Sequence, residues 1–252
     1  MTDKDLYKPA PSIIKNSHAN EEIYEKMYRE SISSPEEFWR YHGQRIDWIK
    51  PYTKVNNVSY KKEDLRINWY EDGTLNASFN CLDRHLKTKG KNTAIIWEGD
   101  NPDESKHISY NELYEDVCKF SNVLKNAGAK KGDRITIYMP MIPEATIAML
   151  ACTRIGAIHS VVFGGFSPDA LAGRIEDCNS TIIITADEGV RGGKSIPLKS
   201  NTDEAISKAK MCKTTIVVRR TGSKINWIDD QDIWYHEEME KASPNCPPTE
   251  MN

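Results

Sequence analysis

The sequence predicts an α/β fold in which helices flank a layered, largely parallel β-sheet. Three observations lead to this prediction. Short, continuously apolar stretches recur at residues 135–139, 158–163 and 181–185, and such strands are typical of a sheet covered on both faces. Helical patterns of apolar residues fill the two intervals between these strands. The joints are short and contain Gly or Pro, so right-handed crossovers are expected to connect parallel strands.

Three regions are expected along the chain. Residues 1–20 are polar and show no helical period, which predicts a flexible arm. Residues 21–80 are expected to form a helical and extended region that packs on the main domain, and residues 81–252 to belong to the main domain itself. Within this region we expect one helix with an apolar face and a second helix with a buried aromatic side. Aromatic residues at helical spacing more often anchor packing than form a ligand-binding site, so we interpret them as packing residues. The residues concerned are Ile23, Tyr24, Met27 and Tyr28 in the first helix, and Phe38, Trp39 and Tyr41 in the second.

The segments before and after the core have readable boundaries. A strand is predicted at 65–70 and a helical face at 75–86. Residues 93–98 and 106–109 are expected to pair as a hairpin. Ser109-Tyr110-Asn111-Glu112 matches a capping box, in which the Ser and Glu side chains bond backbone N–H groups at the start of a helix. Beyond the core, the pattern predicts a helix at 198–209, a strand at 214–219, a helix at 232–242 and a Pro-rich linker at 243–248.

Composition excludes several classes of protein. The formal net charge of -3, from 34 basic and 37 acidic residues, gives no reason to expect nucleic acid or an anionic membrane as a partner. Charged or polar residues at 144, 154 and 159 interrupt the most apolar region, so no membrane span is expected. The N-terminus lacks the apolar core of a secretory signal. The six cysteines show no metal-ligand spacing. A cytoplasmic protein with no metal site is expected.

Two joints at the carboxyl ends of strands have the composition of an anion site. The first joint is Phe163-Gly164-Gly165-Phe166, which connects a strand to a helix. Its two glycines have no Cβ atom, so a ligand can approach the backbone closely. The helix that Ser167 caps would point its N–H groups toward the same place. Ligands of open parallel sheets bind at this edge. A tight strand-to-helix turn without a ligand is the alternative.

The second joint is VRGGK at residues 190–194. Arg191 offers a planar fork suited to phosphate, Lys194 a mobile charge, and Gly192 and Gly193 backbone amides that could join them. If the two strands are neighbours, the two joints are expected to lie close together, and a phosphate-bearing ligand there is then a hypothesis. An exposed basic loop is the alternative. No catalytic set of side chains is found, and acidic pairs such as Asp187-Glu188 are interpreted as solvated turns.

Several long segments carry a family resemblance. They include TAIIWEGD at 93–100, IYMPMIPEATIAMLACTRIGAIHSVVFGGFSPDALAGRI at 137–175 and DEGVRGGKSIPLK at 187–199. In these segments the chain resembles the acetyl-coenzyme A synthetases, AMP-forming acetate–CoA ligases of the adenylate-forming superfamily. These enzymes convert acetate, ATP and CoA to acetyl-CoA, AMP and pyrophosphate through acetyl-adenylate. The resemblance implies that residues 81–252 are the first part of an AMP-binding domain.

The resemblance also assigns an expected ligand to the two joints. Residues Arg191, Gly192, Gly193 and Lys194 match the family loop that holds the CoA nucleotide and its 3′-phosphate, and the turn beside it matches at Phe163, Gly164 and Gly165. Ile196 and Pro197 are expected to line the adenine. Relatives carry Arg where this chain has Lys194, so the charge is kept but a bidentate contact is not.

The resemblance places the adenylation machinery beyond residue 252. Family members are much longer, and their ATP phosphate loop, acetate pocket and Mg site are expected after this chain. An amino-terminal fragment is therefore expected, with no catalytic residue and no acetyl-adenylate formation by itself. A propionyl-CoA or other short-chain acyl-CoA synthetase, and a non-catalytic module that binds CoA or another nucleotide, are the alternatives. Self-association through exposed apolar surface is a further expectation.

Overall fold

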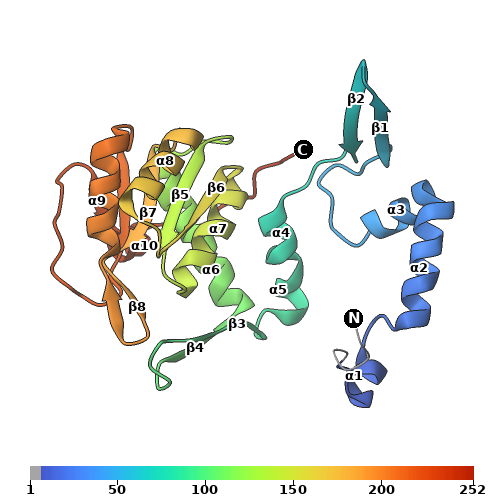
Figure 1. Cartoon of the computed structure of the whole chain (residues 1–252), viewed down its shortest axis with the longest axis horizontal. Coiled ribbons are helices and arrows are strands. Elements are labelled where there is room, and N and C mark those ends of the chain that lie inside the picture. Colours follow the sequence, from blue (N-terminus) through green and yellow to red (C-terminus); the bar gives the residue numbers. More distant parts are fainter. Residues whose placement is uncertain (1–6) are drawn as a thin grey trace. The chain divides into compact units, whose positions relative to one another are not determined.

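The computed structural model describes residues 7–252, and these form two compact units (Figure 1). One unit contains the chain up to Asp47 together with Pro51–Gly73. The other contains Trp48–Lys50 and Thr74–Asn252. Within residues 7–252, no helix is both long enough and apolar enough to cross a bilayer. The expected packing of residues 21–80 on the main domain stays a prediction.

From residue 7 onward, the first unit consists of three helices and one antiparallel hairpin. Asn20 caps the second helix, since its side chain accepts a hydrogen bond from the N–H of Ile23 at 2.9 Å. The strand expected at 65–70 is confirmed. Its partner strand is not predicted, because its sequence NNVSYK is mostly polar. The elements are α1 (Pro11–Asn16), α2 (Glu21–Ser33), α3 (Pro35–Gly43), β1 (Asn56–Lys61) and β2 (Asp64–Trp69).

Part of the predicted arm is helical. Residues 1–6 of that arm lie outside the described residues, whereas residues 11–16 form α1 although their sequence shows no helical period. The flexibility of the arm stays a prediction. Pro11 occupies the first position of α1, where a backbone N–H is not needed and where the fixed φ of proline suits the helix. All six residues of α1 are exposed.

Within the first unit the aromatic side of α3 is only partly covered, with Phe38 half-buried, and its burial against the main domain stays a prediction. Trp39 is 40% exposed and Tyr41 is 67% exposed. Trp39 contacts the ring of Trp69 edge-on, with 5.8 Å between centroids, and its carbonyl accepts a hydrogen bond from the Tyr70 hydroxyl at 2.7 Å. A unit of short helices and one hairpin is too small to cover both sides of these aromatic residues.

The second unit begins with a broken helix. The apolar face expected at 75–86 forms two short helices, α4 (Ala77–Cys81) and α5 (Asp83–Lys89). Leu82 interrupts them, with φ -122° and ψ -70°, and its side chain is 1% exposed. Burial of this leucine therefore takes precedence over a continuous helix.

The predicted hairpin and capping box are both confirmed. β3 (Thr93–Glu98) pairs with β4 (Ser105–Ser109) in antiparallel fashion. The next helix, α6 (Tyr110–Asn126), begins where the Glu112 N–H donates to Ser109 Oγ and the Ser109 N–H donates to Glu112 Oε2. These reciprocal bonds fix the angle at which the chain leaves the hairpin.

A five-stranded parallel sheet organises the second unit, as predicted. Its strand order is β11-β10-β7-β5-β6, and every neighbouring pair is parallel. β7 is buried at each of its positions, as its continuous apolar sequence indicates. The strands are β5 (Arg134–Met139), β6 (Ile158–Phe163), β7 (Ile182–Ala186), β10 (Thr214–Val218) and β11 (Asp232–Trp234).

Helices cover both faces of this sheet. α6 packs with α7 and α10, and α8 packs with α9. The chain passes from β5 through α7 to β6, and then returns across β5 through α8 to β7. Crossovers between parallel strands are right-handed as a rule. These two run in opposite directions along the sheet, so α7 and α8 lie on opposite faces. The helices are α7 (Pro143–Ile155), α8 (Pro168–Cys178), α9 (Leu198–Ala209) and α10 (Tyr235–Lys241).

Two features of the sheet were not predicted from the sequence. β6 and β7, whose ends carry the two joints, are not neighbours, because β5 lies between them. Residues 232–242 are not one helix, since the first three form β11 and only α10 is helical. The pairing of β11 with β10 satisfies backbone groups that a helix would leave at the sheet edge, and this tertiary pairing overrides the local helical pattern.

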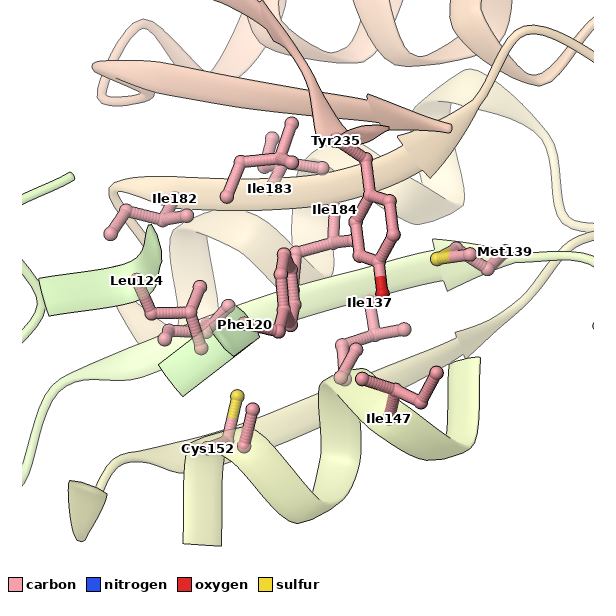
Figure 2. Packing of buried hydrophobic residues seen from close by; sticks show 14 of the residues in the cluster. Phe120, Leu124, Ile137, Met139, Ile147, Cys152, Ile182, Ile183, Ile184 and Tyr235 are labelled. Atoms are coloured by element: carbon pink, nitrogen blue, oxygen red, sulfur yellow. The ribbon is translucent and has the colours of Figure 1, made fainter. Parts of the chain in front are cut away.

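The apolar core is shown at close range in Figure 2, where α6, α7, α10 and the sheet contribute side chains. The ring of Phe120 lies 4.7 Å from the ring of Tyr235, centroid to centroid. Ile137 of β5 and Ile147 of α7 belong to the same buried cluster. Burying a side chain of this size contributes about 1.5–3 kcal/mol, so this cluster holds the scaffold on which the strand ends are positioned.

The segment expected as a Pro-rich linker is held against the second unit. The Asn122 side chain donates to the carbonyls of Ser243 and Asn245 at 2.8 and 3.0 Å. The Asn76 side chain donates to the Thr249 carbonyl at 2.8 Å. The segment contains no helix or strand, as expected of a linker, and the side-chain amides of Asn122 and Asn76 attach it and the following Thr249 to the second unit.

Candidate ligand site at the carboxyl edge of the sheet

A pocket of about 690 Å³ lies at the carboxyl ends of β5, β6 and β7. Connections leave β5 and β7 in opposite directions, so the pocket occupies the topological switch point, where open α/β sheets bind ligands. Its walls are formed by residues 97–100, 139–142, 161–165 and 189–191 together with Ile196, Leu198 and Arg220. Among the residues expected at the site, the pocket is lined by Phe163, Gly164, Gly165, Arg191 and Ile196, but not by Gly192, Gly193, Lys194 or Pro197.

The turn after β6 is packed tightly from within the protein. A Cβ atom on Gly164 would lie 3.1 Å from the carbonyl oxygen of Met139, and one on Gly165 would lie 2.6 Å from the Phe163 ring. A side chain at position 164 would therefore crowd the backbone of Met139, whereas one at position 165 would meet only the ring of Phe163, which is 56% exposed and can move aside. Sequence reasoning did not include Tyr138, whose buried hydroxyl donates to the Phe166 carbonyl at 2.8 Å and supports this turn.

The second joint forms a short hairpin of β8 (Gly189–Arg191) and β9 (Lys194–Ile196). Arg191 and Lys194 are directly opposite each other in its register, so their side chains lie on the same face of the hairpin. The Arg191 guanidinium lies 5.7 Å from the centroid of the Phe163 ring. The structure thus brings the two joints together across β5, with an exposed cation on an aromatic ring at the pocket wall.

The backbone amides of the second joint already have a partner. Gly192 and Gly193 have φ of +58° and +70°, and their N–H groups donate to the two carboxylate oxygens of Asp100 at 2.8 Å each. These two hydrogen bonds lower the pKa of Asp100, the Gly193 bond having the larger effect. Asp100 therefore occupies these amides in this structure, and the binding of a phosphate to them stays a prediction.

The β3–β4 hairpin connects loops that follow three different strands. Its Asp100 binds the β8–β9 turn after β7. The Trp97 indole donates to the Met141 carbonyl, after β5, at 2.7 Å. Glu104 accepts a hydrogen bond from Arg220, after β10, at 2.6 Å, and the Arg220 guanidinium lies 5.3 Å from the Trp97 ring centroid. The hairpin therefore forms a wall of the pocket and holds the surrounding loops together.

Asp187 is a buried structural group and not the solvated turn that its sequence indicates. It is 1% exposed, and its carboxylate accepts backbone N–H groups of Glu188, Arg220, Thr221 and Gly222 at 2.7 to 3.2 Å. Four donors on one carboxylate fix the loop that carries Arg220. A charged residue directly after a fully apolar strand was the available signal for this role.

Comparison with known proteins agrees with this architecture. The family model described as "AMP-binding enzyme" matches residues 82–251. The chain belongs to the AMP-binding enzyme family. In this family member, residues 24–81 match a second model, "Acetyl-coenzyme A synthetase N-terminus". The resemblance seen in the sequence is thereby confirmed.

Relatives of this AMP-binding chain are close in sequence but longer. It is 58% identical over 255 residues to an acetyl-coenzyme A synthetase of Mesorhizobium japonicum. This alignment covers 100% of this chain and 39% of that protein. It is 63% identical over 234 residues to an acetyl-coenzyme A synthetase of Agrobacterium fabrum, covering 91% of this chain and 36% of that protein. The chain thus spans less than two fifths of the length of these relatives.

A solved structure shares the fold. An acetoacetyl-CoA synthetase from Streptomyces lividans superposes with a TM-score of 0.80 at 20% identity, over 90% of this chain and 34% of that one. At this identity the likeness concerns the fold alone.

Proposed function

We propose that this chain is the N-terminal part of an acetyl-CoA synthetase and that its pocket holds the nucleotide end of CoA. The whole enzyme would convert acetate, ATP and CoA to acetyl-CoA, AMP and pyrophosphate through acetyl-adenylate. The names of the close relatives favour acetate over propionate or another short acyl group. The main observation that supports a CoA site here is that the Arg191 guanidinium lies over the Phe163 ring, beside a pocket at the topological switch point of the sheet.

Residues of the pocket and of the adjoining β8–β9 turn, which carries Gly192, Gly193 and Lys194 outside the pocket lining, suit a phosphorylated nucleotide in different ways. Arg191 can give a phosphate two parallel hydrogen bonds, and the Phe163 ring beneath it limits the orientations of the guanidinium. Lys194, opposite Arg191 on the hairpin, adds a second positive charge without bidentate geometry. Ile196 lines the pocket and offers apolar surface to an adenine ring. Gly192 and Gly193 contribute the shape of the turn, since their amides bind Asp100.

The same proposal limits what this chain does alone. No catalytic residue is assigned to it, and ATP, Mg and acetate would bind to parts of the enzyme outside residues 1–252. We expect the purified chain to give no acetate-dependent exchange of pyrophosphate with ATP. A cytoplasmic location belongs to the same proposal.

Calorimetric titration with CoA and with 3′-dephospho-CoA tests the site. The chain is expected to bind CoA more tightly than 3′-dephospho-CoA, and Arg191→Ala is expected to remove the difference. Loss of one exposed, charge-assisted phosphate contact should weaken CoA binding about tenfold, or ~1.4 kcal/mol. Arg219→Ala is the matched control, because Arg219 also lies on an aromatic ring, that of Trp234 at 4.5 Å, but does not line this pocket.

Two outcomes would contradict the proposal. One is equal CoA affinity in the Arg191→Ala and Arg219→Ala variants. The other is the absence of CoA binding by the unaltered chain, which would leave a scaffold without a nucleotide site. Equal affinity for ATP and CoA, independent of the 3′-phosphate, would instead favour a general nucleotide-binding module.

A further inference from the structure

We propose that Asp100 is a positioning residue that fixes the β8–β9 turn, so that the phosphate of the ligand is read by the side chains of Arg191 and Lys194 and not by the turn amides. This inference rests on the proposed function for its ligand. The contact that carries it, Asp100 to Gly192 and Gly193, joins residues 92 and 93 positions apart in the sequence.

The turn itself has the geometry of an anion site. Two consecutive residues with positive φ point successive N–H groups into one concavity, an arrangement that binds phosphates and carboxylates in many proteins. Here each N–H donates to a different oxygen of the same carboxylate, at 2.8 Å. Both donors are used, so a ligand phosphate could reach them only by displacing Asp100.

Asp100 is presented by a well-anchored element. It follows β3 at the tip of the β3–β4 hairpin, where the Gly99 N–H donates to the Glu104 carbonyl at 2.7 Å. The Glu104 side chain is paired with Arg220 at 2.6 Å, and the Trp97 indole is bonded to Met141. These contacts hold the backbone on both sides of Asp100.

The β8–β9 hairpin needs such an attachment. Each of its strands has three residues, and a hairpin of this length is not stable by its own pairing. Its turn consists of two glycines, which lose more conformational freedom on ordering than any other residue. Without Asp100, Arg191 and Lys194 would move with a loose turn, and ligand binding would have to order it.

Asp100 also has an unfavourable effect on phosphate binding. Its negative charge lies in the turn beside Arg191 and Lys194 and would repel a phosphate bound there. The carboxylate and its surroundings are exposed, so water and salt screen this repulsion. Its two oxygens are also occupied by N–H donors. We therefore expect the ordering effect to exceed the repulsion.

The binding test compares Asp100→Ala with Asp103→Asn in the full 252-residue chain. Asp103 lies in the same exposed turn of the β3–β4 hairpin, so its neutralisation is a matched change of charge. Calorimetry is expected to show about tenfold weaker CoA binding in Asp100→Ala and unchanged binding in Asp103→Asn. Formate, a small carboxylate, should partly restore CoA binding in Asp100→Ala but not in Arg191→Ala. CoA binding by Asp100→Ala that equals or exceeds that of the unaltered chain would overturn the proposal.

A second measurement needs no ligand and separates this proposal from the proposed function. Amide hydrogen exchange at Gly192 and Gly193, followed by NMR, reports the two bonds to Asp100 directly. Exchange is expected to accelerate at least tenfold in Asp100→Ala and to stay unchanged in Asp103→Asn. Unchanged exchange in Asp100→Ala would refute the positioning role even if CoA binds. Absence of CoA binding by the unaltered chain would refute the proposed function, and with it the phosphate-reading part of this inference, whereas the exchange result would still report the attachment of the turn.

Discussion

Removal of the Asp83 carboxylate tests how strongly the second unit depends on one buried ion pair. The Arg154 side chain is 1% exposed, and its two terminal nitrogens donate to the two Asp83 oxygens at 2.8 and 2.9 Å. Its Nε donates to the Cys246 carbonyl at 2.5 Å. Burial by itself lowers the pKa of Arg154, but the hydrogen bonds and charge of Asp83 raise it on balance, so the guanidinium stays charged.

The expected cost follows from what Asp83→Ala leaves behind. Arg154 would remain as a buried cation without its counterion, a situation that costs about 3–5 kcal/mol. The Cys246 carbonyl and the Tyr114 ring, 5.1 Å from the guanidinium, would remain and offset part of this cost. The Asp83 side chain is 14% exposed, so water can enter where the carboxylate was. The lower end, about 3 kcal/mol, is therefore expected.

Urea unfolding followed by circular dichroism measures this cost. The matched control is Glu204→Ala, because Glu204 pairs with Lys208 at 2.7 Å while their side chains are 56% and 41% exposed, and the expected loss is below about 0.5 kcal/mol. The double variant Asp83→Ala with Arg154→Met should be more stable than Asp83→Ala alone, because the unpaired charge is gone. The reasoning is refuted if Asp83→Ala costs no more than Glu204→Ala, or if the double variant shows no recovery.

Two further predictions concern single polar groups. Tyr138→Phe removes the donor to the Phe166 carbonyl, so we expect about 1 kcal/mol lower stability in urea unfolding and weaker CoA binding by calorimetry; unchanged values for both would contradict its supporting role. Hydrogen bonds from the Thr53 hydroxyl, and then from backbone N–H groups of Lys54 and Thr53, lower the pKa of Asp72 from 3.8 to about 2. The stability that this carboxylate contributes is therefore present above pH 3.8 and lost as pH falls through about 2. NMR titration of the Asp72 carboxyl carbon checks this, and an apparent pKa near 3.8 would contradict it.

Much of the second unit could be read from local sequence patterns. Continuous apolar runs predicted β5, β6 and β7. β5 and β7 are buried, as expected of strands covered on both faces. β6, at the edge of the sheet, is largely exposed, with Ile158 at 54% and Val161 at 55%, so its apolar sequence predicted the strand but not its burial. The capping box at Ser109 and Glu112 predicted where α6 begins, since its two hydrogen bonds join residues three apart. The resemblance at residues 187–199 and 137–175 indicated the family, which comparison confirmed.

Local patterns were weaker where exposure depends on distant partners. Tyr41 has the spacing of a buried aromatic but is 67% exposed, and Asp187 has the composition of a surface turn but is 1% exposed. Residues 232–234 match a helical pattern but pair with β10 as a strand. In each case the exposure or the secondary structure depends on residues that are distant in the sequence, and the local pattern does not contain them.

The sequence by itself determined the central strands β5, β6, β7 and β10, the helices between them, the family and the two glycine-containing joints, because each depends on residues close together in the chain. Only the tertiary structure decided that β5 separates the strands of these joints and that Arg191 nevertheless meets Phe163. It also decided that Asp100, and not a ligand, binds the amides of Gly192 and Gly193. Residues more than 90 positions apart in the sequence are in contact there. A local hydrophobic period or a turn rule cannot predict which distant carboxylate accepts hydrogen bonds from these N–H groups.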